Sequence, residues 1–237
     1  MEQDILKTSW EQRVLFIIIA VLMVFSFVAT YIASVLSNKD SNTSSNDSSD
    51  NPELTAIEEE YQAKTDEITE YAATLSSKYF DNFKGYKSRV KSYNATTANS
   101  DGLKTTDLAE GTGRELKADD TDYLAYYIGW CADESIFDSS FDDTDNPTEL
   151  KAPIYAKNGL IEGWNQGVIG MKLGGVREIT IPGELAYGES QEICGGTNSP
   201  LKFVVLPFAD EKMQKLGEES NEIMERLYAA YYSSSSN

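Results

Sequence analysis

Hydrophobic and polar positions divide the first part of this chain into three segments. Residues 14–36 form an apolar run without a charged side chain, and a helix needs about 20 such residues to cross a bilayer. Residues 37–51 are polar and of low complexity, which predicts a flexible linker. Apolar residues then recur at steps of three and four across residues 52–85, as they do in an amphipathic helix. The pattern therefore predicts a transmembrane anchor, a linker and a helical stalk.

The length of the apolar run favours an uncleaved anchor over a removed signal peptide, whose apolar core is about 7 to 15 residues long. Lys7 and Arg13 precede the run, whereas Lys39 after it is followed at once by an acidic residue. An excess of positive charge marks the cytoplasmic side of a span. We therefore expect a single-pass protein of the cell membrane, with residues 1–13 in the cytoplasm and everything after Leu36 outside.

The helix predicted at residues 52–85 carries an apolar seam of about three heptads. The positions of this seam are Leu54, Ile57, Tyr61, Ile68, Tyr71 and Leu75, interrupted by Lys64. Such a seam fits a stalk that pairs two copies into a homodimer, and it fits equally a helix packed on its own domain or on a C-terminal helix. Residues 209–232 predict that second amphipathic helix, and residues 233–237 predict a disordered tail.

Residues 86–208 lie between the two helical segments and combine short apolar runs with turns. Strands are predicted at residues 86–94, 123–129, 176–181 and 200–206. A short helix is predicted from Trp164 through Met171, ended by the glycines at positions 174 and 175. This mixture predicts a domain of the α+β class.

Composition excludes several classes of site. The net charge is −19, so no nucleic-acid partner is expected, because the phosphates would be repelled. The chain has no histidine, which excludes imidazole acid–base catalysis and histidine metal ligands. The acidic residues at 141–149 lack the ligand spacing and the glycine of an EF-hand loop, so a solvated loop is expected there rather than a calcium site.

The densest group of candidate functional residues runs from Gly159 to Gly188. Within it, Trp164 stands beside an apolar strand, where it can floor a pocket, although a tryptophan in such a place is more often part of the core. The order of residues closely resembles the signature of the FKBP family, the immunosuppressant-binding peptidyl-prolyl isomerases. The matching residues are Leu160, Ile161, Gly163, Trp164, Gly167, Met171, Gly174, Ile181, Pro182, Glu184, Leu185, Ala186, Tyr187 and Gly188.

The resemblance extends over residues 102–206. Tyr127 takes the place of the family's pocket tyrosine, whose hydroxyl bonds the ligand, and Phe203 takes the place of a pocket-lining aromatic. Phe137 and Asp138 match the F-D-S-S motif, in which the phenylalanine walls the pocket and the aspartate reaches into it. From the residues alone, a core position for Phe137 and a turn cap for Asp138 are preferred.

Two departures accompany the resemblance. Residues 141–143 read Phe-Asp-Asp where the family commonly has the arginine that partners the pocket aspartate. The family also often has an aromatic residue in the strand after the F-D-S-S loop, and residues 150–155 of this chain offer no secure equivalent. These two changes predict an altered substrate preference rather than lost catalysis. Separately, the loop at residues 189–199, which the resemblance places over the pocket, lacks the family's isoleucine-proline tip.

The resemblance implies a twisted antiparallel β-sheet wrapped around a short α-helix. It also implies isomerisation of X-Pro bonds in unfolded or exported polypeptides that contain proline. Rotation of an amide faces a barrier of about 18–20 kcal/mol, and an apolar pocket low in water favours the twisted amide over the planar one. Such catalysis needs no nucleophile, metal or cofactor. The alternative is a membrane-anchored peptide-binding module or chaperone without catalysis.

The resemblance also assigns the site residues. The predicted catalytic residues are Tyr127, Asp138, Trp164 and Tyr187. The predicted substrate-binding residues are Phe137, Leu160, Ile161 and Phe203. The backbone N–H of Ile161 and the two tyrosine hydroxyls would orient the carbonyl groups of a substrate.

The two cysteines are candidates for a disulfide bond. Cys131 follows the strand that borders the implied pocket, and Cys194 lies in the loop over it. An even number of cysteines outside the cell can form disulfides. The sequence leaves open whether these two are bonded to each other.

Overall fold

A computed structural model describes residues 52–234 of the chain, with side chains as far as Tyr231. The predicted cytoplasmic end, anchor and linker at residues 1–51 therefore lie outside the described residues, as do the last three residues of the predicted tail. Within the described part, no helix is both long enough and apolar enough to cross a membrane.

An antiparallel sheet forms the centre of the described chain. Its strands follow the order β1-β5-β6-β2-β3, and β4 pairs with β2 beside β3. The strands are β1 (Lys104–Ala109), β2 (Leu124–Trp130), β3 (Ile136–Ser139), β4 (Ile154–Tyr155), β5 (Val176–Ile181) and β6 (Leu201–Phe208). The α+β class and the antiparallel sheet predicted from the sequence are confirmed.

The two middle strands, β2 and β6, are buried on both faces of the sheet. Side chains on one face form an outer core, which includes Leu124, Tyr126, Ile128, Trp130, Val204, Leu206 and Phe208. Side chains on the other face form an inner core, which includes Ala125, Tyr127, Leu201, Phe203 and Val205. Because successive residues of a strand point to opposite faces, a strand covered on both sides is an almost continuous apolar run.

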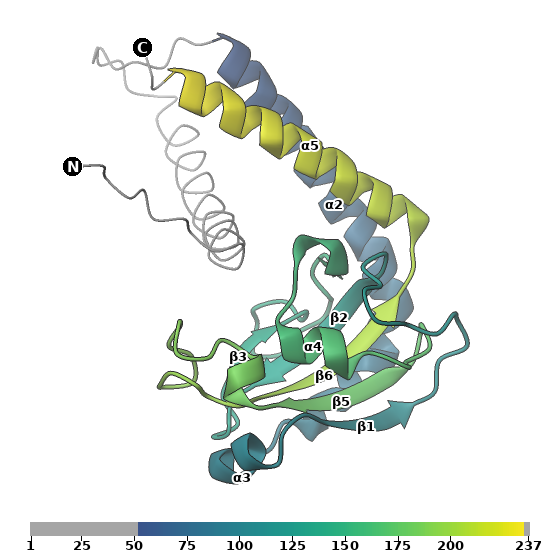
Figure 1. Cartoon of the computed structure of the whole chain (residues 1–237). Helices are drawn as coiled ribbons and strands as arrows, with labels where there is room; N and C mark the ends of the chain where they lie inside the picture. Colours follow the sequence, from purple (N-terminus) through teal and green to yellow (C-terminus); the bar gives the residue numbers. More distant parts are fainter. Residues whose placement is uncertain (1–51, 235–237) are drawn as a thin grey trace, which may run out of the picture. The chain divides into compact units, whose positions relative to one another are not determined.

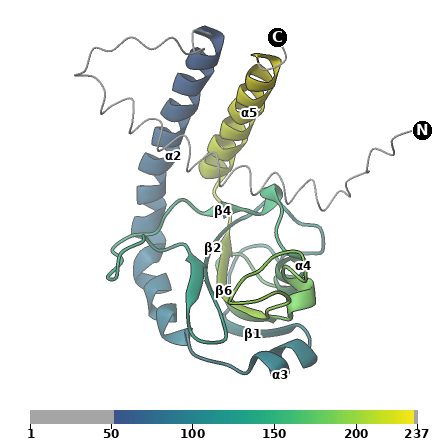
Figure 2. The same ribbon diagram turned by 90° about the vertical axis from the view of Figure 1, so that its left-hand side faces the viewer.

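The helices divide between these two faces. Helix α2 (Pro52–Phe83) lies across the outer face, and the short helix α4 (Glu162–Gly167) lies across the inner face (Figure 2). The outer core takes Ala72, Leu75 and Phe83 from the last turns of α2, together with the half-buried rings of Tyr79 and Phe80. The N-terminal helix is therefore part of the hydrophobic core of the domain.

The first half of α2 runs beside helix α5 (Glu211–Ser234), as Figure 1 shows. Lys64, which interrupts the apolar seam, places its ammonium 2.7 Å from a carboxylate oxygen of Glu219 in α5. A second ion pair joins Arg226 to Glu60 at 2.9 Å. The first half of the seam thus faces the C-terminal helix of the same chain, and Ile68, Tyr71 and Leu75 pack on the outer core. Both contacts belong to the alternative of a helix packed within its own chain; a homodimer through the seam stays a prediction.

The strand predicted at residues 86–94 is wrong. The chain instead continues past Gly85 as a 3₁₀ helix, η1 (Lys84–Arg89), and reaches helix α3 (Ala95–Ser100), whose first turn is capped by the side chain of Asn94. The alternating pattern arises because Tyr86, Val90 and Tyr93 pack directly onto the outer core without pairing to a strand.

We predict that Phe83→Ala lowers the free energy of unfolding by about 3–5 kcal/mol, the usual effect of truncating a buried phenylalanine. Phe83 is fully buried, with its ring stacked on Phe141 at 5.7 Å and tilted against Tyr126 at 6.4 Å. Urea denaturation followed by circular dichroism measures the change. Thr74→Ala, on the exposed side of the same helix, is the control and should stay within about 0.5 kcal/mol of the wild type. Equal stabilities of the two variants would contradict the packing of α2 on the sheet.

Candidate active site

Two glycines allow helix α4 to lie very close to the sheet. A Cβ atom on Gly163 would come within 2.2 Å of the Ile181 side chain in β5, and one on Gly167 would come within 2.7 Å of Ile179. The two positions are four residues apart and therefore share one face of the helix. Only glycine fits at this distance, and the close contact brings Trp164 of α4 onto the inner core.

Helix α4 is shorter than the sequence predicted. It ends at Gly167 rather than near Met171, and the chain then turns at Gly170, whose φ is +78°. Arg177 explains this end, because its buried guanidinium donates hydrogen bonds to the carbonyls of Gly167 at 2.8 Å and Ile169 at 2.9 Å. These carbonyls would otherwise lack partners at the end of the helix. Sequence reasoning missed Arg177, whose only signal was a cation inside an apolar strand.

Trp164 is both a core residue and the floor of an aromatic cluster. Its side chain is 2% exposed, and its indole N–H donates to the hydroxyl of Tyr123 at 3.2 Å. Its ring meets Phe203 at 5.3 Å and Tyr127 at 5.6 Å, both edge to face. Phe137 meets Phe203 in the same way at 5.6 Å. Edge-to-face contacts fix the relative orientation of the rings.

Gly129 makes room for two of these rings. A Cβ atom there would lie 2.7 Å from the ring of Phe137 and 2.8 Å from that of Phe203. The glycine therefore lets both aromatic rings fold over strand β2. The sequence pattern marked Gly129 only as the end of a strand, because nothing in the local sequence shows which rings cross it.

Asp138 takes its partner from the neighbouring strand. The hydroxyl of Tyr127 in β2 donates a hydrogen bond to the carboxylate of Asp138 in β3. Burial raises the pKa of the Tyr127 hydroxyl, and the negative charge of Asp138 raises it further. The pKa of Tyr187 is raised by the same two causes in the same order. Both hydroxyls therefore keep their protons at neutral pH.

The residues that stand where the family has its arginine do not pair with Asp138. Phe141 is buried in the outer core, where its ring stacks on Phe83 at 5.7 Å. The next residue, Asp142, accepts hydrogen bonds from Thr144 and Thr148 of its own loop. The Tyr127 hydroxyl thus binds the aspartate in a chain that lacks the arginine common in the family.

The remaining predicted residues form the rim of the same cluster. Leu160, Ile161 and Tyr187 are half-buried and pack against the inner core. Ile161 precedes α4, and its carbonyl accepts from the backbone N–H of Trp164 at 3.0 Å. Its own N–H has no hydrogen-bond acceptor among the described residues. Seven of the predicted site residues thus share one apolar cluster, and Asp138 joins it through Tyr127.

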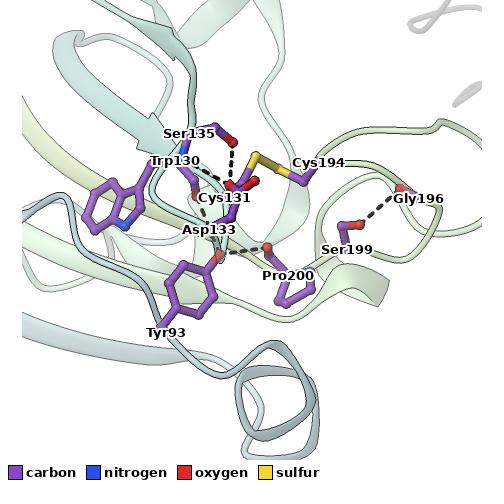
Figure 3. The surroundings of a disulfide bond; sticks show 9 residues. All are labelled: Tyr93, Trp130, Cys131, Asp133, Ser135, Cys194, Gly196, Ser199 and Pro200. Carbon is purple, nitrogen blue, oxygen red and sulfur yellow. Dashed lines mark hydrogen bonds between the residues drawn. A yellow bond between two sulfur atoms is a disulfide. The ribbon is translucent and has the colours of Figure 1, made fainter.

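A disulfide closes one side of the site. The structure joins Cys131, next to the end of β2, to Cys194 in the loop at residues 189–199, with 5.5 Å between the two Cα atoms (Figure 3). Within residues 52–234, no three acidic, cysteine or histidine side chains are grouped as metal ligands would be. The site itself is built from aromatic rings, tyrosine hydroxyls and backbone groups, together with the Asp138 carboxylate.

Comparison with known proteins finds matches over the part of the chain that carries this site. A family model described as FKBP-type peptidyl-prolyl cis-trans isomerase matches residues 114–206. The FK506-binding protein of Neisseria meningitidis serogroup B is 38% identical over 90 residues, which are 37% of this chain and 75% of that protein. The FKBP-type peptidyl-prolyl cis-trans isomerase FkpA of Aeromonas hydrophila is 30% identical over 175 residues, or 71% of this chain and 60% of that protein. Among solved structures, AtFKBP13 is 29% identical and covers 46% of this chain and 92% of its own, with a TM-score of 0.35.

We predict that Arg177→Met lowers the free energy of unfolding by about 2–3 kcal/mol, because the carbonyls at the end of α4 lose a charged donor. Arg177 also binds Asp107, at 2.6 Å, but the Asp107 side chain is 65% exposed. Asp107→Asn should therefore lower the same quantity by no more than about 1 kcal/mol. Denaturation of both variants tests this contrast, and equal effects would assign the role of Arg177 to the ion pair instead.

Lowering the pH should reduce the stability of the wild type by about as much as the substitution Asp107→Asn does, because protonation of Asp107 removes the same ion pair. Arg177 lowers the pKa of Asp107, mainly through their hydrogen bond. The ion pair therefore stabilises the wild type at neutral pH, and its contribution is lost as the pH falls through the lowered pKa. Asp107→Asn should lack this part of the pH dependence.

Proposed function

The chain belongs to the FKBP-type peptidyl-prolyl cis-trans isomerase family, and on this basis we propose that it isomerises X-Pro bonds of exported polypeptides outside the cell membrane. The observation that carries the proposal is the aromatic cluster around Trp164. The hydroxyls of Tyr127 and Tyr187 lie at this cluster, as does the backbone N–H of Ile161, which has no acceptor within residues 52–234. Tyr127 lies on the sheet and Trp164 on helix α4, both held by buried contacts, whereas Ile161 immediately precedes α4 and Tyr187 lies in the turn after β5.

The aromatic cluster accounts for the lowered barrier. A planar amide carries more charge separation than a twisted one, so a pocket that excludes water disfavours the planar ground state relative to the transition state. Trp164 lies beneath the proline ring of the substrate in this proposal, and Phe137 and Phe203 flank it. Leu160 and Ile161 cover the neighbouring apolar groups.

Hydrogen bonds orient the substrate over this floor. A tyrosine hydroxyl has a single proton, and Tyr127 directs its proton to Asp138. The donors left for substrate carbonyls are the Tyr187 hydroxyl and the backbone N–H of Ile161. Asp138 and Tyr127 then act as a pair, in which the carboxylate fixes the orientation of the hydroxyl and its lone pairs.

Two features support action outside the cell membrane. The apolar run at residues 14–36 is long enough for a membrane span, and the positive charge before it favours a cytoplasmic N-terminus. The disulfide between Cys131 and Cys194 belongs to an oxidising compartment. We therefore propose a single-pass anchor with the isomerase domain on the outer side, where exported chains fold.

The isomerase is tested by its effect on cis/trans exchange in X-Pro peptides, measured by NMR on the full chain in detergent micelles. Acceleration is expected from the wild type. Tyr127→Phe should lower kcat/KM by about tenfold to a hundredfold, because it removes a hydrogen bond to a charged group worth about 1.5–3 kcal/mol. Tyr187→Phe should act mainly through a raised KM, because it removes a donor to the substrate.

The control for these variants lies on the same strand. Tyr126 is adjacent to Tyr127 but points into the outer core, and its buried hydroxyl has no hydrogen-bond partner among the described residues. Tyr126→Phe should therefore leave kcat/KM unchanged. A folded wild type that binds X-Pro peptides without accelerating their exchange would reject the enzyme and support the alternative, a membrane-anchored binding module or chaperone.

The anchor is tested by fractionation of cells that express the full chain. We expect the protein in the membrane fraction after alkaline extraction, and we expect added protease to reach the domain from the outer side of the membrane. Deletion of residues 14–36 should release it. A wild-type protein that is extracted by alkali or protected from protease would contradict the proposed location.

A further inference from the structure

The tip of the loop at residues 189–199 has no hydrogen-bonded tie to the rest of the domain. Among the described residues, the backbone bonds of residues 191–197 stay inside the loop, such as the pair between Ile193 and Gly196 at 3.0 and 3.2 Å. Thr197 likewise donates to Glu189 of the same loop. Besides apolar contacts, the disulfide at Cys194 is therefore what connects the tip to the domain.

The base of the loop is held independently of the disulfide. Asn198 donates its backbone N–H to the carbonyl of Gly188 at 2.6 Å, which closes the loop at its neck. Asn99 of α3 bridges the neck to the turn after β5, since its amide nitrogen donates to the Asn198 carbonyl at 3.2 Å and its amide oxygen accepts from the Gly183 N–H at 2.8 Å. Opening the disulfide therefore frees the tip while the neck stays in place.

The other end of the disulfide is rigid. Cys131 is 4% exposed, and its backbone N–H donates to the Ser135 carbonyl at 2.8 Å. Tyr93 supports this turn from below, because its N–H binds the Ala132 carbonyl at 3.0 Å and its hydroxyl binds the Pro200 carbonyl at 2.8 Å (Figure 3). The turn leads directly into β3, the strand that carries Phe137 and Asp138.

The tip packs against the inner core, and its backbone has an unusual conformation at Cys194. Ile193 and Cys194 pack against the inner core, the apolar cluster that also contains Trp164. Cys194 has a φ of +58°, in the left-handed region that residues with a side chain rarely adopt. A free tip would leave this conformation readily, so the bond to Cys131 keeps Ile193 at the rim.

We propose that the Cys131–Cys194 disulfide positions the rim of the pocket, so that its redox state sets how well the site binds and discriminates X-Pro substrates. The proposal rests on the peptide site of the proposed function. A dithiol opens the bond in a two-electron exchange, in which the protein gains two thiols and the dithiol becomes a disulfide. The oxidised form then presents a fixed rim, and the reduced form presents a mobile one.

The experiment compares the oxidised full chain in micelles with the same protein after reduction by dithiothreitol. We expect reduction to lower kcat/KM by about threefold to tenfold, mostly through KM, because the immobilised contacts at the rim are lost. The difference in kcat/KM between peptides with different X residues should shrink. Amide hydrogen exchange should accelerate at residues 191–197 and remain unchanged in β2 and β5.

Two variants distinguish the effect of opening the disulfide from a general loss of structure. Cys194→Ser opens the bond at its half-buried end and should reproduce the effect of reduction without added thiol. The double variant Cys131→Ser, Cys194→Ser should no longer respond to dithiothreitol. A response of this double variant would show that the reductant acts elsewhere and would overturn the proposal.

Peptide affinity, followed by the fluorescence of Trp164 and the other tryptophans, separates failure of this proposal from failure of the isomerase. If the wild type binds peptide but does not accelerate its isomerisation, the isomerase activity is rejected. The role of the disulfide is then still tested by comparing the peptide affinities of the oxidised and reduced forms. If the oxidised and reduced forms have equal peptide affinity, turnover and X preference, the proposal about the disulfide is overturned. This holds even if amide hydrogen exchange at the tip is faster in the reduced form. Absence of peptide binding in both forms overturns both proposals.

Discussion

Burial of strand β2 on both faces is the constraint on which the rest of the structure depends. Tyr126 and Tyr127 are neighbours, yet one packs under helix α2 and the other stands in the aromatic cluster. A strand that is covered on both sides is fixed in register, because a shift of one residue would exchange its two apolar sets. The arrangement of the aromatic cluster therefore depends on the core behind it, and the position of Tyr127 relative to Trp164 follows from packing that begins on the opposite face.

The site was predictable where its residues follow one another in a distinctive order, and unpredictable where a distant side chain decides the local structure. The sequence around Trp164 placed the floor, the rim residues and strand β5 without knowledge of the fold. The end of α4 escaped prediction because it is set by Arg177, which lies ten residues after Gly167 and acts across space. Residues 86–94 alternate like a strand, but their apolar side chains cover an existing core rather than extend the sheet.

The absence of the arginine that is common in the family changes how Asp138 is held, because the Tyr127 hydroxyl binds the carboxylate without neutralising it. An arginine would neutralise the carboxylate, whereas Tyr127 offers one proton and no charge. The negative charge therefore remains in the site, where it helps to keep the hydroxyl of Tyr187 protonated. A pocket of this kind retains its aromatic floor while the balance of donors and charge at its edge differs, which is a physical basis for an altered substrate preference.

The helical extension and the pocket are two sides of one folded unit rather than a stalk joined to an independent domain. Phe83, Tyr79 and Leu75 cover the outer face of the same sheet whose inner face carries the site. Without α2, the side chains of Tyr126, Ile128 and Trp130 would be exposed as a contiguous apolar surface, and such a surface promotes association. Helix α5 extends this arrangement by covering the first half of α2, so both terminal helices belong to the same folded unit as the aromatic cluster.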